Sequence, residues 1–176
     1  MPSSYDVHAY PPPDATHPYV AHTLPGRTDD EVTAAGEEFA AHMGGRRSIR
    51  MFSDRPVPRA AIESAITAAS TAPSGAHMQP WTFVVVGDPD TKAAIREAAE
   101  EEERVNYEGG RIGEEWRDAL APLGTDWRKP FLERAPWLVV LFEQRMGVRE
   151  DGTTFHHYYV KESVGIAAGI FVTALH

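Results

Sequence analysis

The sequence contains no cysteine. This absence excludes disulfide bonds, thiolate nucleophiles and cysteine-based metal sites together. Long apolar runs are missing as well. The longest apolar stretch, Val164 to Leu175, is interrupted by glycines and is far shorter than the ~20 residues that a membrane-spanning helix requires. We therefore predict a soluble protein, and a reducing cytoplasm is compatible with the lack of cysteine.

Basic residues are in the minority, with 17 lysines and arginines against 26 aspartates and glutamates. The resulting net charge of −9 opposes binding to nucleic acid and to anionic membranes, so neither is expected as a partner. An anionic cofactor would require a local basic pocket. Residues 1–20 are polar and rich in proline, without a basic start or an apolar core, so no secretion signal is expected.

The 176 residues suit one folded domain. Residues 1–28 are predicted to form an extended N-terminal arm, because three consecutive prolines from Pro11 to Pro13 stiffen it. Residues 29–176 are predicted to form the domain. The pattern of its last residues stops inside a helix without a cap, so we expect the domain to be truncated at its C-terminus.

Hydrophobic periodicity and turn residues predict a succession of helices and strands. The expected helices are Asp29–Met43, Arg59–Ser70, Thr91–Tyr107 (capped by Asp90), Glu114–Leu120, Thr125–Arg134 and His156–His176; the expected strands are Trp81–Val86 and Trp137–Phe142, with a loop over 147–153. The continuous apolar run of the second strand indicates burial on both faces. The mixture predicts an α+β fold with helices around a sheet.

Three arginines and a serine are concentrated in the segment Arg46-Arg47-Ser48-Ile49-Arg50. Forked guanidinium groups match the oxygens of a phosphate ester in pairs, so this arginine segment is a candidate anion site. A second candidate is the loop that begins Pro73-Ser74-Gly75. Its glycine allows close approach to a planar ligand, and its serine can bond a polar ring atom. By themselves, the first segment is better explained as a solvated surface cluster and the second as a helix stop.

The third candidate combines Glu103, Tyr107 and Lys129, which we call the head-group set. Glu103 and Tyr107 lie one helical turn apart, and Lys129 adds a cation. A carboxylate for an ammonium group and a cation for a carboxylate are what an amino-acid zwitterion requires. Without further information, a solvated acidic helix face explains these residues better. His156 and His157 are not expected to bind metal, since adjacent helical residues point about 100° apart.

Taken together, these motifs resemble the nitroreductase superfamily of flavin enzymes and, within it, the iodotyrosine deiodinases. The pattern Pro-Ser-x-x-x-x-Gln-Pro-Trp over residues 73–81 is typical of the superfamily. The variant Gly75-Ala76-His77 and the head-group set followed by Ala135-Pro136 resemble the deiodinases. The resemblance runs from about Glu38 to His176.

This resemblance implies a nitroreductase-like sandwich with a central, mostly antiparallel sheet flanked by helices. It also implies an intertwined homodimer with a long central interface helix and FMN between two subunits. The implied FMN ligands are Arg46, Arg47, Ser48, Ile49, Arg50, Pro73 and Ser74. The implied substrate contacts are the Ala76 amide and the head-group set, with residues 103–130 forming a substrate lid. No catalytic residue beyond these contacts is implied.

The implied activity is FMN-dependent reductive dehalogenation of a 3-halo-L-tyrosine to tyrosine and halide. The choice among iodo, bromo and chloro substrates stays open. NAD(P)H would be the ultimate electron donor, directly or through a separate flavin reductase. The alternatives are a general NAD(P)H-dependent nitroreductase or quinone reductase, a flavin-fragmenting enzyme, and a non-catalytic flavin-binding protein. The head-group set favours the dehalogenase.

Overall fold

The computed structural model describes residues 26–176, so most of the predicted arm over 1–28 lies outside the described residues. The chain divides into two units, of which the first ends at Gly44 and the second begins at Gly45. In the first unit, helix α1 (Asp29–Gly44) begins with a capping box. The amide of Thr28 donates to Oε2 of Glu31 at 2.8 Å, and the amide of Glu31 donates to Oγ1 of Thr28 at 3.3 Å. The helix predicted from Asp29 is confirmed.

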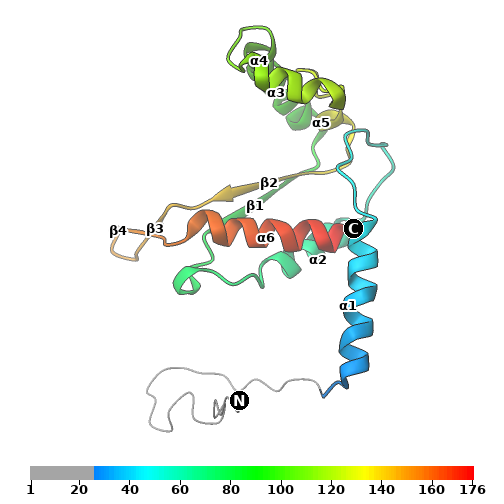
Figure 1. Ribbon diagram of the computed structural model, residues 1–176. Helices are drawn as coiled ribbons and strands as arrows, with labels where there is room; N and C mark the ends of the chain where they lie inside the picture. Colours follow the sequence, from blue (N-terminus) through cyan, green and yellow to red (C-terminus); the bar gives the residue numbers. More distant parts are fainter. Residues whose placement is uncertain (1–25) are drawn as a thin grey trace. The chain divides into compact units, whose positions relative to one another are not determined.

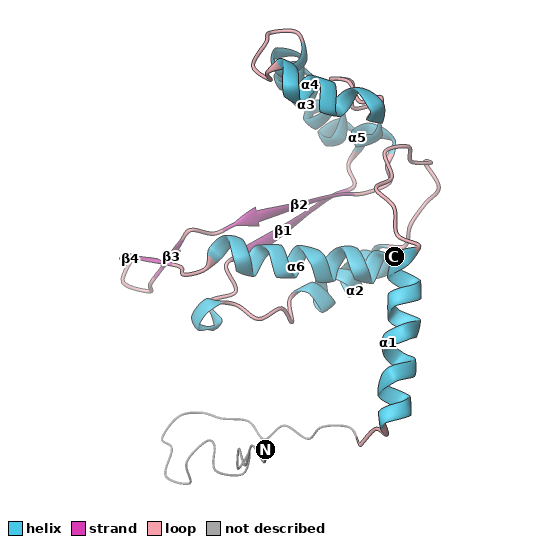
Figure 2. Cartoon of the chain, viewed as in Figure 1, coloured by secondary structure: helices cyan, strands magenta, loops and turns pink. Residues whose placement is uncertain are grey.

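The second unit contains the remaining helices and strands (Figures 1 and 2). In chain order they are α2 (Arg59–Ala69), the 3-10 turn η1 (Gly75–His77), β1 (Trp81–Val86), α3 (Pro89–Tyr107), α4 (Glu114–Leu120), the 3-10 turn η2 (Ala121–Leu123), α5 (Phe131–Arg134), β2 (Leu138–Glu143), β3 (Met146–Val148), β4 (Thr154–His156) and α6 (Val160–Leu175).

The strands pair as two antiparallel ladders. Strands β1 and β2 run from the pair Trp81–Glu143 to the pair Val86–Leu138, and β3 and β4 form a short hairpin. Figure 1 shows α6 and α2 lying beside the β1–β2 ladder. The rings of Phe83 on β1 and Phe171 on α6 are 5.6 Å apart and join these layers. Helices on an antiparallel ladder agree with the predicted α+β class.

Small side chains allow α2 and α6 to approach closely. Ala65 and Ala69 on α2 and Ala167 on α6 are each at most 2% exposed, and Ile62 is also buried. Ser163 on α6 is buried and donates its hydroxyl to the carbonyl of Tyr159 at 2.6 Å. A buried polar group needs such a partner. The burial of Ile62 and Ala69 confirms the predicted apolar face of the helix from Arg59.

Helix α3 is anchored to the segment around α5. Lys92 is 7% exposed, and its Nζ donates to the carbonyl of Ala135 at 2.8 Å. Arg96 pairs with Glu133 at 2.9 Å. A buried ammonium requires such an acceptor, because desolvation without one is costly. These contacts fix the helix that carries the first two residues of the head-group set.

Two predicted boundaries near this anchor are wrong. The cap of α3 is Asp88 rather than Asp90, because Pro89 occupies the first helical turn and the amide of Thr91 donates to the Asp88 carboxylate at 2.8 Å. The hydroxyl of Thr91 also donates to this carboxylate, which lowers the pKa of Asp88. The helix predicted over 125–134 shrinks to α5, since Asp126 accepts from the amide of Arg128 in a local turn.

Three further corrections concern the C-terminal half. Strand β2 is not buried on both faces, since Phe142 is 52% exposed. The loop predicted over 147–153 starts at Arg149, because Gly147 and Val148 belong to β3, and it forms the turn of the β3–β4 hairpin. That hairpin takes up His156, so α6 begins later than predicted, at Val160.

His157 belongs to neither hairpin strand nor helix, and its Nδ1 lies 2.7 Å from the carbonyl oxygen of Gln144. Between residues 26 and 176, no helix combines the length and the apolar character needed to cross a bilayer.

Candidate functional site

The structure brings the head-group set together. Nζ of Lys129 lies 3.1 Å from Oε2 of Glu103 and 5.4 Å from the centre of the Tyr107 ring. The side chains of Glu103 and Lys129 are 34% and 18% exposed, so the pair is screened only partly by water. Glu103 also accepts from the side-chain amide of Asn106 at 3.3 Å. A carboxylate, a phenol and an ammonium group thus share one half-buried place.

Lys129 is held there by its backbone and its side chain. Its amide donates to Oε1 of Glu100 at 2.7 Å, and its ammonium group also donates to the carbonyl of Asp126. Glu100 is itself bound by Arg96 at 2.9 Å. The hydrogen bonds from Arg96 and then from the Lys129 amide lower the pKa of Glu100 below its ordinary value, so its carboxylate stays charged.

Cation–π contacts hold the segment just before Lys129. The guanidinium of Arg104 on α3 lies 4.4 Å from the centre of the Trp127 ring, and that of Arg128 lies 4.8 Å from it. Such contacts contribute about 0.5–1 kcal/mol each where water has access. Tyr107 adds a hydrogen bond, since its hydroxyl donates to Oγ1 of Thr125 at 3.1 Å. These contacts join the end of α3 to the segment before α5.

A cleft contains Arg50 of the arginine segment and Lys129 of the head-group set. It has a volume of about 490 Å³ and is lined by residues 50–51, 123–126 and 128–131. Arg50 and Lys129 are its cationic wall together with Arg128, while Leu123 and Phe131 supply apolar surface. A cleft of this size, largely apolar with a few fixed charges, is typical of a small-molecule site.

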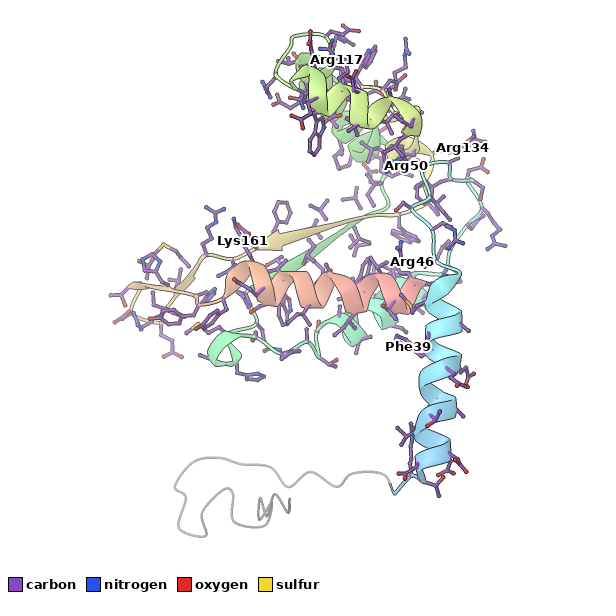
Figure 3. All side chains as sticks on the ribbon, in the orientation of Figure 1. Phe39, Arg46, Arg50, Arg117, Arg134 and Lys161 are labelled. Carbon is purple, nitrogen blue, oxygen red and sulfur yellow. The ribbon has the colours of Figure 1, made fainter. Side chains whose placement is uncertain are left out.

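The arginine segment carries neither helix nor strand, and all five of its residues are exposed. Arg50 reaches the cleft beside α5, whereas Arg46 lies well apart from it (Figure 3). Arg47 donates to the carbonyl of Arg46 at 2.8 Å. Of the three arginines, only Arg50 lines the cleft.

The loop after α2 has an unusual backbone. Ala76, His77 and Gln79 have φ of 50°, 55° and 46°, in the left-handed region that non-glycine residues rarely adopt. The hydroxyl oxygen of Ser74 accepts from the amide of Gln79 at 2.9 Å. Strain of this kind is concentrated at ligand sites and persists only where surrounding contacts impose it.

Gly75 is required in this loop by close packing. A Cβ at this position would stand 2.7 Å from the carbonyl oxygen of Tyr158 and 2.9 Å from Cδ2 of Tyr159. The Gly75 amide donates to Oγ of Ser163 at 3.3 Å, which ties the loop to α6. The loop that carries Pro73 and Ser74 is thus held by packing against Tyr158 and Tyr159 and by the hydrogen bond to Ser163.

One chain does not unite all predicted site residues. Figure 1 places the loop at η1, which carries Ala76, well away from α3 and α4. Lys129 of the head-group set and Arg50 line one cleft, but Ala76 belongs to a different region of the unit.

Several residues at the site were not predicted. Glu100 binds the amide of Lys129 and is bound by Arg96, and the i,i+4 spacing of Arg96 and Glu100 was a detectable signal of pairing. Trp127 was also missed as a contact of α3. No sequence signal distinguishes it from an exposed aromatic residue.

Known proteins of similar sequence and structure were found. An iodotyrosine deiodinase of Haliscomenobacter hydrossis is 52% identical over 147 residues, covering 84% of this chain and 66% of that protein. An iodotyrosine deiodinase of Nematostella vectensis is 44% identical over 148 residues, covering 84% of this chain and 56% of that protein. This chain thus spans about half to two thirds of the length of these relatives.

A solved structure is similar to this chain as well. A crystal structure of an oxidized iodotyrosine deiodinase bound to FMN and 3-iodo-L-tyrosine superposes with a TM-score of 0.68 at 29% identity, covering 77% of this chain and 67% of that one. The sequence model of the Nitroreductase family matches residues 43–176, which include the arginine segment, the strained loop and the head-group set. With its motifs, its fold and this match in agreement, the chain belongs to the nitroreductase family.

Proposed function

We propose that this protein uses FMN to replace the halogen of a 3-halo-L-tyrosine with hydrogen, releasing tyrosine and halide. The observation that carries the proposal is the approach of Lys129 to Glu103 at 3.1 Å, beside the ring of Tyr107. The relatives named iodotyrosine deiodinase support it, as does a solved structure that holds FMN and 3-iodo-L-tyrosine.

The head-group set has the charges to bind an amino-acid zwitterion. The substrate ammonium would pair with Glu103 and the substrate carboxylate with Lys129, so that each substrate charge meets its opposite. Glu103 and Lys129 pair with each other at 3.1 Å, and the substrate charges would replace or extend this pair. Partial burial strengthens such pairs relative to bulk water. Tyr107 would cover the head group from α3.

The residues present also fit FMN. Arg46, Arg47, Ser48 and Arg50, with the backbone of Ile49, would hold its phosphate and the polar edge of its ring. Pro73 and Ser74 would contact the ring. The Ser74 hydroxyl accepts from Gln79, which leaves its proton free to donate to a ring acceptor. FMN, when bound, supplies the electrons that the loss of halide requires.

The chain would contribute binding and orientation to this chemistry. The head-group set would fix the amino-acid end of the substrate, and the Ala76 amide would donate to the phenolate oxygen and favour the ionised phenol. The lid over residues 103–130 would exclude water when the substrate bridges its two ends.

The proposal includes a homodimer. Ala76 and the head-group set belong to separate regions of one chain, so a second copy would join them (Figure 1). The α6 face that would meet it has open space at Gly165 and Gly169, and Ile166 and Val172 are 44% and 46% exposed beside them. Such a face allows two helices to approach closely. NAD(P)H as electron donor, a separate flavin reductase, the preferred halogen and a cytoplasmic location stay predictions.

The experiment is anaerobic mixing of the reduced, FMN-loaded protein with 3-iodo-L-tyrosine. We expect flavin reoxidation with release of one equivalent of iodide for each flavin, about one-to-one because each turnover consumes one reduced cofactor. Reoxidation by a nitroaromatic compound but not by iodotyrosine would favour a general nitroreductase. A protein that binds FMN and oxidises with neither would be a flavin-binding protein without this activity.

A further inference from the structure

Lys129 lies in a segment without regular secondary structure. Residues 125–130 form neither helix nor strand, so no ladder of backbone hydrogen bonds sets the position of this lysine. Its amide is instead bound by a side chain: Oε1 of Glu100 accepts from it at 2.7 Å. The carbonyl of Lys129 also accepts from the amide of Leu132 on α5 at 3.0 Å, so contacts from α3 and α5 together set its position, and α3 supplies its charge partner.

Glu100 is itself held by Arg96, which also contacts α5. Nε of Arg96 donates to its carboxylate at 2.9 Å, and NH1 of the same arginine reaches Glu133 on α5 at 2.9 Å. The Glu100 side chain is 16% exposed, less than that of Arg96 or Glu133. Arg96 thus joins α3 to α5 through Glu133 and restrains the Glu100 carboxylate, to which the Lys129 amide donates.

Two carboxylates of α3 bind different groups of Lys129. Glu100 takes the backbone amide of Lys129 and Glu103 takes its ammonium group, at 2.7 Å and 3.1 Å. Residues three apart lie on the same helical face, so both contacts are made by one side of α3. The amide hydrogen bond fixes the backbone from which the Lys129 side chain reaches Glu103, so the ammonium group starts from a set position beside α3.

We propose that Glu100 is a positioning residue for recognition of the amino-acid head group: by binding the Lys129 amide, it holds the lysine ammonium opposite Glu103. This inference rests on the proposed function. Glu100 is not among the residues that line the cleft at Arg50 and Lys129, so we expect its loss to weaken the binding of zwitterionic substrates and to leave the dehalogenation step itself intact. Arg96 acts through Glu100 and shares the role.

The test compares two substrates on the FMN-loaded protein, 3-iodo-L-tyrosine and 2-iodophenol, which lacks the amino-acid head. For Glu100→Ala we expect KM for 3-iodo-L-tyrosine to rise about tenfold, which corresponds to losing one charge-assisted hydrogen bond, with kcat nearly unchanged. KM for 2-iodophenol is expected to stay within about twofold. Glu100→Gln keeps an oxygen that accepts from the amide and should restore most of the loss.

Glu101→Ala is the matched control, since Glu101 is the next residue of the same helix and is exposed. Glu101→Ala should leave KM and kcat unchanged for both substrates. If Glu100→Ala does not fold, Glu100→Gln carries the test, with a smaller rise in KM confined to 3-iodo-L-tyrosine. Equal losses on both substrates, or an unchanged KM for 3-iodo-L-tyrosine in the folded variants, would overturn the proposal.

Measurements of substrate binding test the role of Glu100 independently of the proposed activity. If the parent protein releases no iodide, the proposed activity is wrong, and dissociation constants from flavin fluorescence decide the role of Glu100. A loss of 3-iodo-L-tyrosine affinity in Glu100→Ala, with 2-iodophenol unaffected, would support it. A parent protein that does not prefer 3-iodo-L-tyrosine to 2-iodophenol would contradict it.

Discussion

The hydroxyl of Tyr107, at the end of α3, donates to Oγ1 of Thr125 at 3.1 Å and so connects the two ends of segment 108–124. This segment contains the short helix α4, on which Trp116 is 62% exposed. One side-chain hydrogen bond thus helps to close a loop that otherwise has few buried contacts.

Replacing Tyr107 with Phe removes this hydrogen bond and leaves the ring in place. We expect the closed form of segment 108–124 to lose about 0.5–1.5 kcal/mol, so limited proteolysis should cut it faster. Added 3-iodo-L-tyrosine should protect the segment in the parent protein. Tyr158→Phe is the control, because Tyr158 is an exposed tyrosine outside the lid. Identical cleavage of parent protein and Tyr107→Phe would show that the bond does not hold the lid.

The elements predicted correctly from the sequence are those with strong local signals. Helix α2 and strand β1 follow from apolar periodicity and flanking prolines, and both lie where expected. The hairpin β3–β4 was missed, because its three-residue strands are too short to show a period.

At the site, the sequence predicted that Glu103, Tyr107 and Lys129 act together, and the structure brings them together. That prediction came from a resemblance, since composition alone favoured a solvated acidic face. Glu100 stands in the run Glu100 to Glu103, and nothing local shows which of these glutamates makes a tertiary contact. A hydrogen bond from a side chain to the backbone of a distant segment, such as that of Glu100 with Lys129, cannot be predicted from one sequence.

Acid should weaken the attachment of Lys129 to α3. The pKa of Glu100 is lowered in the folded protein, mainly by Arg96, from an ordinary value of 4.5. A lowered pKa contributes stability that is fully present above the ordinary value and is lost as pH falls through the folded value. The stability difference between parent protein and Glu100→Gln should therefore shrink from about pH 6 to about pH 3 in urea unfolding experiments. A difference that grows on acidification would contradict this assignment.

The buried Lys92 should matter for stability rather than for activity. Lys92→Met preserves most of the side-chain volume but leaves the buried carbonyl of Ala135 without its donor. We expect a loss of about 1–3 kcal/mol in the free energy of unfolding, measured in urea. Lys161→Met changes an exposed lysine on α6 and should have little effect. Equal stability of the two variants would mean that the Lys92 hydrogen bond contributes nothing.

FMN affinity should depend on the arginine segment. Arg50→Ala and Arg46→Ala each remove one guanidinium, and each charged hydrogen bond contributes about 1.5–3 kcal/mol. FMN titration should show affinity reduced by about tenfold to a hundredfold in each variant. Arg55→Ala, outside the segment and exposed, should bind FMN like the parent protein. Undiminished affinity in both variants would remove the segment from the FMN site.

The central claim is that the head-group set recognises the amino-acid end of a halotyrosine. Its most direct test is the dissociation constant of Glu103→Gln for 3-iodo-L-tyrosine and for 2-iodophenol, measured on the FMN-loaded protein. We predict that affinity for 3-iodo-L-tyrosine falls about tenfold or more, because an amide replaces the charge that faces the substrate ammonium, while 2-iodophenol binds as before. Equal losses for both ligands would contradict the claim.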